Sequence, residues 1–71
     1  MVDKIIIYGK NGWPYTDKAR SAFGNSAIYV DVTTNTDKLA EMLQLSDGRR
    51  QVPVIVKNGK ATVGYGGSWG V

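Results

Sequence analysis

The most constraining feature of this sequence is an uninterrupted run near its amino end, Lys4–Tyr8, in which three isoleucines are followed by a tyrosine. β-Branched and aromatic residues favour a strand, and the lack of a polar residue after Lys4 means that both faces of that strand must be covered. The run ends at Gly9, and after a short loop Pro14 favours the first turn of a helix, where its missing N–H costs nothing. The amino-terminal part therefore predicts a strand, a loop and a helix that belong to a covered sheet.

The rest of the chain predicts further alternating helices and strands. The expected elements are a helix from Pro14 that ends at Gly24-Asn25, a strand at Ala27–Val30, a helix capped within Thr34–Thr36 and ended at Asp47-Gly48, and strands at Val52–Val56 and Lys60–Val63. The apolar stripes of the helices are Tyr15, Ala19, Ala22 and Phe23 on the first and Leu39, Met42 and Leu43 on the second. Asn58-Gly59 is typical of a two-residue hairpin turn, so the last two strands should be antiparallel. The order β-α-β-α-β-β predicts an α/β fold with a mixed four-stranded sheet, in a single domain of residues 1–71.

The composition excludes several classes of protein. The chain of 71 residues contains neither cysteine nor histidine, which excludes a zinc finger, an iron–sulfur cluster held by its own thiolates, and acid–base catalysis by histidine. We therefore expect no metal site. The net charge is +3 and the basic residues are scattered, with only Arg49 and Arg50 adjacent, so small anions are expected as ligands before nucleic acid. The apolar segments are too short to span a membrane and the first residues do not resemble a signal peptide, which predicts a cytoplasmic protein.

Three segments resemble, in order and at matching spacing, the characteristic segments of glutaredoxins. Lys10–Thr16 is similar to the active-site loop of that family, in which Lys, a short spacer, Cys, Pro, Tyr and Cys follow the first strand. Arg49–Pro53 is similar to its Arg-x-Thr-Val-Pro segment, and Gly64–Gly67 resembles its glycine turn. The resemblance implies a thioredoxin/glutaredoxin-like fold and disulfide oxidoreductase activity, with glutathione as co-substrate and no bound cofactor. Glutaredoxins usually carry a third helix after the glycine turn, and we expect that helix to be missing here because only Trp69–Val71 follow.

Position 13 departs from the family pattern, because it holds Trp where glutaredoxins have their nucleophilic Cys. With Pro14, Tyr15 and Thr16 after it, the site most resembles a group of small bacterial selenoproteins that carry a selenocysteine-Pro-Tyr-Thr motif. The selenocysteine codon UGA differs from the Trp codon UGG by one base and can be read through as Trp. We therefore expect Trp13 to stand in for selenocysteine, or else for cysteine, and the chain as written to be inactive. The structural alternative is a semi-exposed aromatic residue that closes the edge of the core.

The start of a helix is a favourable position for an anionic nucleophile at residue 13. The free N–H groups and the positive end of the helix dipole stabilise an anion and lower the pKa of a thiol. Thr16 lies three residues on and either donates a hydrogen bond to that anion or caps the helix. Threonine cannot resolve a mixed disulfide, which favours monothiol-type chemistry. Resemblance to the selenoprotein group suggests Trp69 as a second, resolving redox position, and an apolar plug is the alternative.

The glutathione groove that the resemblance implies draws on three parts of the chain. Its expected residues are Lys10, Tyr15, Arg49, Gln51, Val52, Pro53, Gly66 and Gly67. Cations and donors on two sides of a groove suit a tripeptide with two carboxylates. The resemblance also implies a cis bond at Val52-Pro53, which would let the Val52 backbone pair with an extended peptide as an added strand does. The acidic residue that the family usually places after the glycine turn has no counterpart in Gly67-Ser68.

Two functions remain open from the sequence. One is a thiol- or selenol-dependent oxidoreductase acting on disulfides or glutathione mixed disulfides. The other is a non-catalytic module that recognises glutathione-like peptides or a protein partner, with Trp13 as an aromatic anchor. A nucleic-acid binder that uses Trp and Tyr for stacking would need a charged stripe, which the sequence lacks. The expected partners are therefore glutathione or a disulfide-containing protein, with no nucleic acid and no membrane, and the chain is expected to be a monomer.

Overall fold

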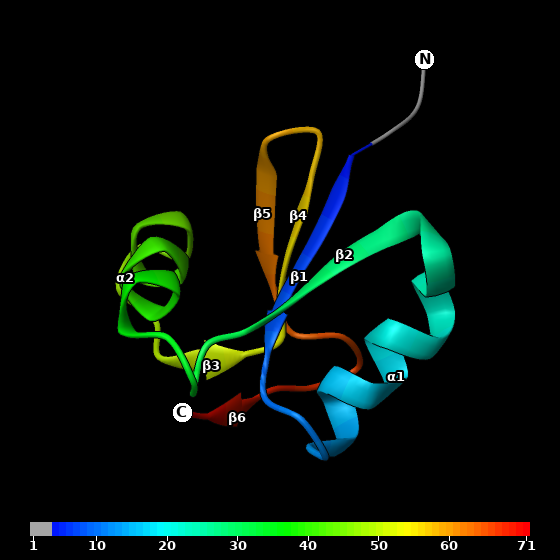
Figure 1. Ribbon diagram of the computed structural model, residues 1–71, viewed down its shortest axis with the longest axis horizontal. Coiled ribbons are helices and arrows are strands. Elements are labelled where there is room, and N and C mark those ends of the chain that lie inside the picture. The colour runs from blue at the N-terminus through cyan, green and yellow to red at the C-terminus, as the bar shows by residue number, and fades with distance from the viewer. Residues whose placement is uncertain (1–3) are drawn as a thin grey trace.

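The computed structural model describes residues 4–71 and has three layers, with a sheet between two helices (Figure 1). The four-stranded sheet has the order β2-β1-β4-β5, formed by Ala27–Asp31, Ile5–Gly9, Val54–Lys57 and Lys60–Val63 respectively. Helix α1 (Pro14–Phe23) covers one face and α2 (Thr36–Leu45) the other, and a 3₁₀ turn at Gly24–Ser26 links α1 to β2. This is the mixed α/β fold that the sequence predicts.

Strand β1 lies at the centre of the sheet, which explains why its sequence has no polar residue. It pairs in parallel with β2, where Ile5 lies opposite Ala27, and antiparallel with β4, where Ile5 lies opposite Lys57. Ile5 and Ile7 are buried on the α1 face, whereas Tyr8 is buried on the α2 face. The strand thus supplies apolar side chains to both layers.

Two apolar clusters hold the layers together. The cluster on the α2 side contains Tyr8, Val32, Met42, Val52, Val54 and Val56, and the cluster on the α1 side contains Ile5, Ile7, Ala19 and Ile55. Leu39 and Leu43 pack against the first cluster, as their spacing predicts. On the α1 side Phe23 also meets the ring of Tyr65 edge to face, with 5.9 Å between the ring centres. Each large apolar side chain buried in this way contributes roughly 1.5–3 kcal/mol.

The turns and caps follow the sequence closely. Asn58 and Gly59, at φ 53° and 81°, form the hairpin turn between β4 and β5. Asn35 caps α2, and its side-chain oxygen accepts hydrogen bonds from two backbone N–H groups of the first turn. Helix α1 ends at Gly24, which has a positive φ of 53°, and Asn25 follows it in the 3₁₀ turn.

Several expectations about the elements are wrong. The strand expected at Val52–Val56 is interrupted at Pro53: Gln51–Val52 forms a separate strand, β3, and β4 begins at Val54. Strand β3 pairs antiparallel with β6 (Trp69–Gly70), a strand that the glycine-rich tail did not predict. On α1, Ala22 is exposed and Thr16 is fully buried, because the helix is rotated so that Thr16 rather than Ala22 joins Ala19 inside. Within residues 4–71 no helix is long and apolar enough to cross a membrane.

Candidate functional site

Residue 13 lies where the loop after β1 enters α1. Trp13 is the N-cap of α1 with an extended backbone, and its carbonyl accepts the first helical hydrogen bond, from the Asp17 N–H at 2.9 Å. Its own N–H donates to the Lys10 carbonyl at 3.3 Å, which closes the loop. The side chain of residue 13 therefore starts beside the unpaired N–H groups at the positive end of the helix.

The ammonium group of Lys10 lies over the ring of Trp13. Its Nζ is 4.3 Å from the ring centre, within the range of a cation–π contact. Lys10 was predicted to belong to the site, and the structure brings it to residue 13. A negatively charged atom at position 13 would lie near this cation as well as near the helix terminus.

Thr16 does not cap the helix, because Trp13 occupies that position. Its side chain is fully buried, and its hydroxyl oxygen accepts a hydrogen bond from the Lys10 backbone N–H at 3.5 Å. A side chain on Gly9 would collide with the methyl and hydroxyl groups of Thr16. Thr16 therefore fixes the loop to the end of β1, a positioning role that its place in the sequence did not predict.

Trp69, near the other end of the chain, lies against Trp13. The two rings meet edge to face with 5.6 Å between their centres, and the Tyr15 ring meets Trp69 at 6.1 Å. In the β3–β6 ladder Trp69 lies opposite Val52, and the Val52-Pro53 bond is cis, as the resemblance implied. Trp69 remains 47% exposed, so it is not a buried plug. The structure thus brings residues 13, 15, 52, 53 and 69 together.

Comparison with protein-family models matches residues 5–62 to Glutaredoxin. The chain belongs to the glutaredoxin family. A search of curated proteins and a search of solved structures each returned no match. The family match supports a redox function of the glutaredoxin kind, and glutaredoxins generally work with glutathione or with disulfide-bearing proteins.

The other residues expected at the site of this glutaredoxin lie around β3 and the tail. Gln51 accepts a hydrogen bond from the Ser68 hydroxyl at 2.7 Å, and together with Arg49 and Arg50 it lines a hollow on the surface. Gly67 lies directly under the Tyr15 ring, so a side chain there would collide with that ring. Gly66 is exposed in the glycine turn, at φ 74°. Lys10 therefore contacts Trp13 and Tyr15 contacts Trp69, whereas Arg49 and Gln51 line a separate hollow beside β3.

The largest pKa shifts in this glutaredoxin occur away from residue 13. Burial raises the pKa of Tyr8 to about 12, helped by its hydrogen bond to the Glu41 carboxylate at 2.6 Å, and that same bond lowers the pKa of Glu41. Burial also raises the pKa of Tyr29 to about 12, with the negative charge of Asp31 adding to the effect. These groups belong to the fold rather than to the candidate site.

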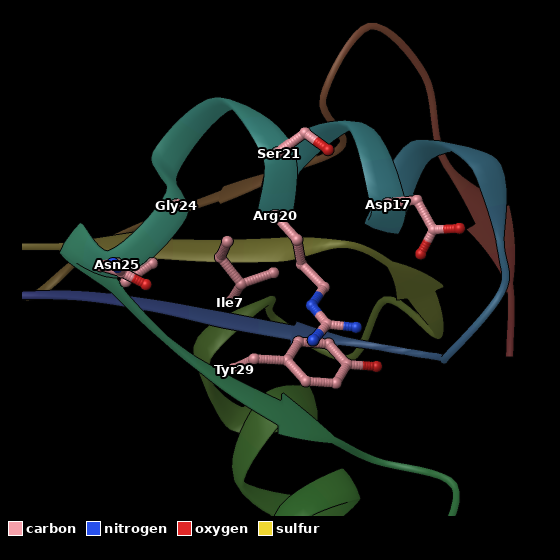
Figure 2. Close-up of a pocket in the computed structure, with 8 residues that line it drawn as sticks. Ile7, Asp17, Arg20, Ser21, Gly24, Asn25 and Tyr29 are labelled. Carbon is pink, nitrogen blue, oxygen red and sulfur yellow. The ribbon is translucent and has the colours of Figure 1, made fainter.

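A hollow of about 550 Å³ beside α1 is also separate from residue 13 (Figure 2). Within it the Arg20 guanidinium lies over the Tyr29 ring, 3.9 Å from the ring centre. Arg20 also donates a hydrogen bond to the Asn11 side chain at 3.4 Å, so it links the loop before residue 13 to β2. No predicted site residue lines this hollow. The sequence did not indicate the contact between Arg20 and Tyr29, because Arg20 is one of many scattered basic residues.

Proposed function

We propose that this chain is a form of a glutaredoxin-like disulfide oxidoreductase whose nucleophile belongs at position 13, where Trp13 stands in for selenocysteine or cysteine. The observation that carries the proposal is the place of residue 13. It is the N-cap of α1, and the Lys10 ammonium lies beside it. Its ring contacts the ring of Trp69, which is paired with Val52 in the β3–β6 ladder. Both the helix terminus and the cation favour an anion there.

The reaction needs a chalcogenide at position 13. The anion attacks the glutathione sulfur of a mixed disulfide, forms a bond to that sulfur, and releases the other sulfur as a thiolate that takes up a proton. The thiolate of a second glutathione then attacks the glutathione sulfur bound to residue 13. Glutathione disulfide forms, the nucleophile is regenerated, and the substrate has gained two electrons. An indole has no atom that can perform the first step, so the chain as written is inactive in this scheme.

The test compares Trp13→Cys with Trp13→Ser in the full chain. The two side chains have nearly the same size, so both variants lose the same indole contacts and differ in the nucleophilic sulfur. With glutathione, glutathione reductase and NADPH, we expect Trp13→Cys to reduce a glutathione mixed disulfide and Trp13→Ser to show only the background rate. A Trp13→Cys protein that keeps the circular dichroism of the fold and has no activity would refute the proposal.

The resolving role proposed for position 69 has its own test. A resolving role requires that the double variant Trp13→Cys/Trp69→Cys form an intramolecular disulfide when oxidised, for which the two Cα atoms must come within about 7 Å of each other. Mass spectrometry would detect the loss of two hydrogens, and each single variant is the control. Failure of the double variant to form this bond would remove residue 69 from the redox scheme.

A binding module without a nucleophile is the second candidate, and the aromatic cluster favours it. Trp13, Tyr15 and Trp69 contact one another and Lys10 covers one ring, which suits an interface anchor as well as a replaced active site. The native codon at position 13 separates the two functions. UGA or a cysteine codon supports the enzyme, and UGG supports the module. In either case we propose a cytoplasmic monomer that takes glutathione or a disulfide-bearing protein as its partner.

A further inference from the structure

The edge of β3 next to the candidate site is filled by the tail of the same chain. Trp69 lies opposite Val52 in the β3–β6 ladder, and the Val71 N–H donates to the Arg50 carbonyl at 3.0 Å (Figure 1). Hydrogen-bonded and non-hydrogen-bonded pairs alternate along two antiparallel strands. Because Arg50 and Val71 form a hydrogen-bonded pair, Val52 and Trp69, two residues further along, form the next one. An extended peptide that adds to Val52 needs those same backbone groups. Strand β6 and such a peptide therefore cannot be bound at once.

The glycine turn before β6 is anchored to the core of the fold. The Gly64 N–H donates to the Pro53 carbonyl at 2.7 Å, and Gly67 lies under the Tyr15 ring. Gly64 and Gly66 have positive φ angles of 93° and 74°, a conformation that glycine adopts without a steric cost. The glycine turn thus fixes the point from which the last four residues extend.

Residues 68–71 are attached mainly by contacts near the surface. None of these residues is fully buried; Val71 packs half-buried against the cluster on the α2 side, and the half-exposed Trp69 ring contacts Trp13 and Tyr15. Strand β6 has two residues, both of them exposed. Its flanking side-chain contacts are the Ser68 hydroxyl on Gln51 at 2.7 Å and the Arg50 Nε on the Val71 carbonyl at 2.9 Å, and both are exposed. Segments with few buried contacts and exposed hydrogen bonds open at low cost, whereas the turn before them is anchored.

The geometry points to β6 as an internal competitor for peptide ligands: residues 68–71 occupy the strand-docking edge at Val52 and must detach before an extended peptide pairs there. The identity of that peptide, a glutathione-like tripeptide, rests on the proposed function. Detachment also moves Trp69 off residue 13, because the indole travels with the strand. The apparent affinity for the peptide is then reduced by the fraction of molecules in which the tail is docked.

The first test is a matched pair of full-length variants, Trp69→Pro and Trp69→Ala. Both lose the indole, but proline also removes the backbone N–H that faces Val52. The probe is S-methylglutathione, which has no free thiol, and its dissociation constant is measured by NMR titration. We expect Trp69→Pro to bind about fivefold more tightly than Trp69→Ala, the factor that corresponds to one backbone hydrogen bond. Ser68→Ala removes the contact to Gln51 and keeps the backbone intact. This variant should bind S-methylglutathione more tightly than the unaltered chain, by less than fivefold.

The second test follows amide hydrogen exchange in the unaltered chain. Saturation with S-methylglutathione should remove the protection of the Val71 amide, while the amides of β4 keep theirs. Equal affinity of the two Trp69 variants, a Val71 amide that stays protected in the complex, or absence of binding to Trp69→Pro would each overturn the inference.

These outcomes are separable from failure of the proposed function. The ligand is redox-inert, so binding and tail release are measured without any nucleophile. Turnover by Trp13→Cys with no change at Val71 would retain the redox proposal and refute the competitor role of β6. Release of β6 by the tripeptide, with no turnover by Trp13→Cys, would retain the competitor and refute the redox reaction.

Discussion

The close approach of Gly9 and Thr16 gives the sharpest prediction about the fold of the site. Both residues are buried, and a side chain on Gly9 would occupy the space of the Thr16 methyl and hydroxyl groups. Gly9→Ala should therefore overpack the end of β1, at a cost of about 1–3 kcal/mol. Thr16→Ala should cost about 1–2 kcal/mol, because it removes a buried methyl group and the acceptor for the Lys10 N–H.

The double variant Gly9→Ala/Thr16→Ala tests this reasoning, because the methyl group added at one position fills space emptied at the other. Its loss of unfolding free energy should be smaller than the two single losses combined by about 1 kcal/mol or more. Gly9→Ala/Thr16→Ser is the matched control: it removes the methyl group but keeps the hydroxyl oxygen, which lies 2.8 Å from a side chain added at Gly9, so it should relieve less of the collision than the double alanine variant. A domain of this length has an unfolding free energy of about 4–10 kcal/mol, so these effects are a large share of the total.

Urea denaturation followed by circular dichroism measures all five proteins, and thermal melts should shift by about 4–8 °C for each kcal/mol. If the losses of unfolding free energy in the two single variants add up to the loss in the double variant within about 0.5 kcal/mol, the idea that the bulk of Thr16 requires glycine at position 9 is refuted.

Three further substitutions test other parts of the structure. Asn35→Ala should lower the unfolding free energy by about 1 kcal/mol in urea, because two N–H groups of α2 lose their acceptor, whereas Asn35→Ser should remain close to the original. Gly59→Ala, at φ 81°, should cost about 1 kcal/mol in the same assay, whereas Gly70→Ala, where a side chain meets only ordinary contacts, should be nearly neutral. Tyr8 has a folded pKa raised to about 12 from 10.0, so its stabilisation is complete below pH 10 and is lost between about pH 10 and 12. The pKa of Glu41 is lowered from its usual 4.5, so Glu41 stabilises the fold at pH values above 4.5, and this stabilisation is lost as the pH falls below that value. Tyr8→Phe should therefore flatten the profile of unfolding free energy against pH at both ends, with Tyr29 maintaining part of the alkaline slope, and an unchanged profile would contradict the hydrogen bond to Glu41.

Local patterns in the sequence predicted most of the fold. The apolar run of β1, Pro14 at the start of α1, and Asn58-Gly59 in the hairpin each favour one local structure strongly, and all three occur where expected. The cap of α2 was predicted only within Thr34–Thr36, and the structure assigns it to Asn35, whose side chain accepts from the free N–H groups of the helix start. The position of residue 13 at the helix start also followed from local sequence.

The features that were missed depend on partners distant in the chain. Strand β6 has no strand signal of its own, because its single tryptophan stands between Ser68 and Gly70, and it forms only because β3 offers an unpaired edge. The burial of Thr16 depends on the space left by Gly9, and the spacing of apolar residues along the helix gives no information about that space. The Tyr8–Glu41 hydrogen bond joins residues 33 positions apart, so periodicity could not reveal it.

The contact between the two indoles gives this protein an optical reporter at one place. Trp13 and Trp69 are its only tryptophans, and their rings touch where the loop, the helix start and the tail meet. Fluorescence excited selectively in indole therefore observes this junction and little else. A change in that emission at constant circular dichroism marks an event at the junction in an intact fold, and a variant that keeps one of the two indoles assigns the change to the loop or to the tail.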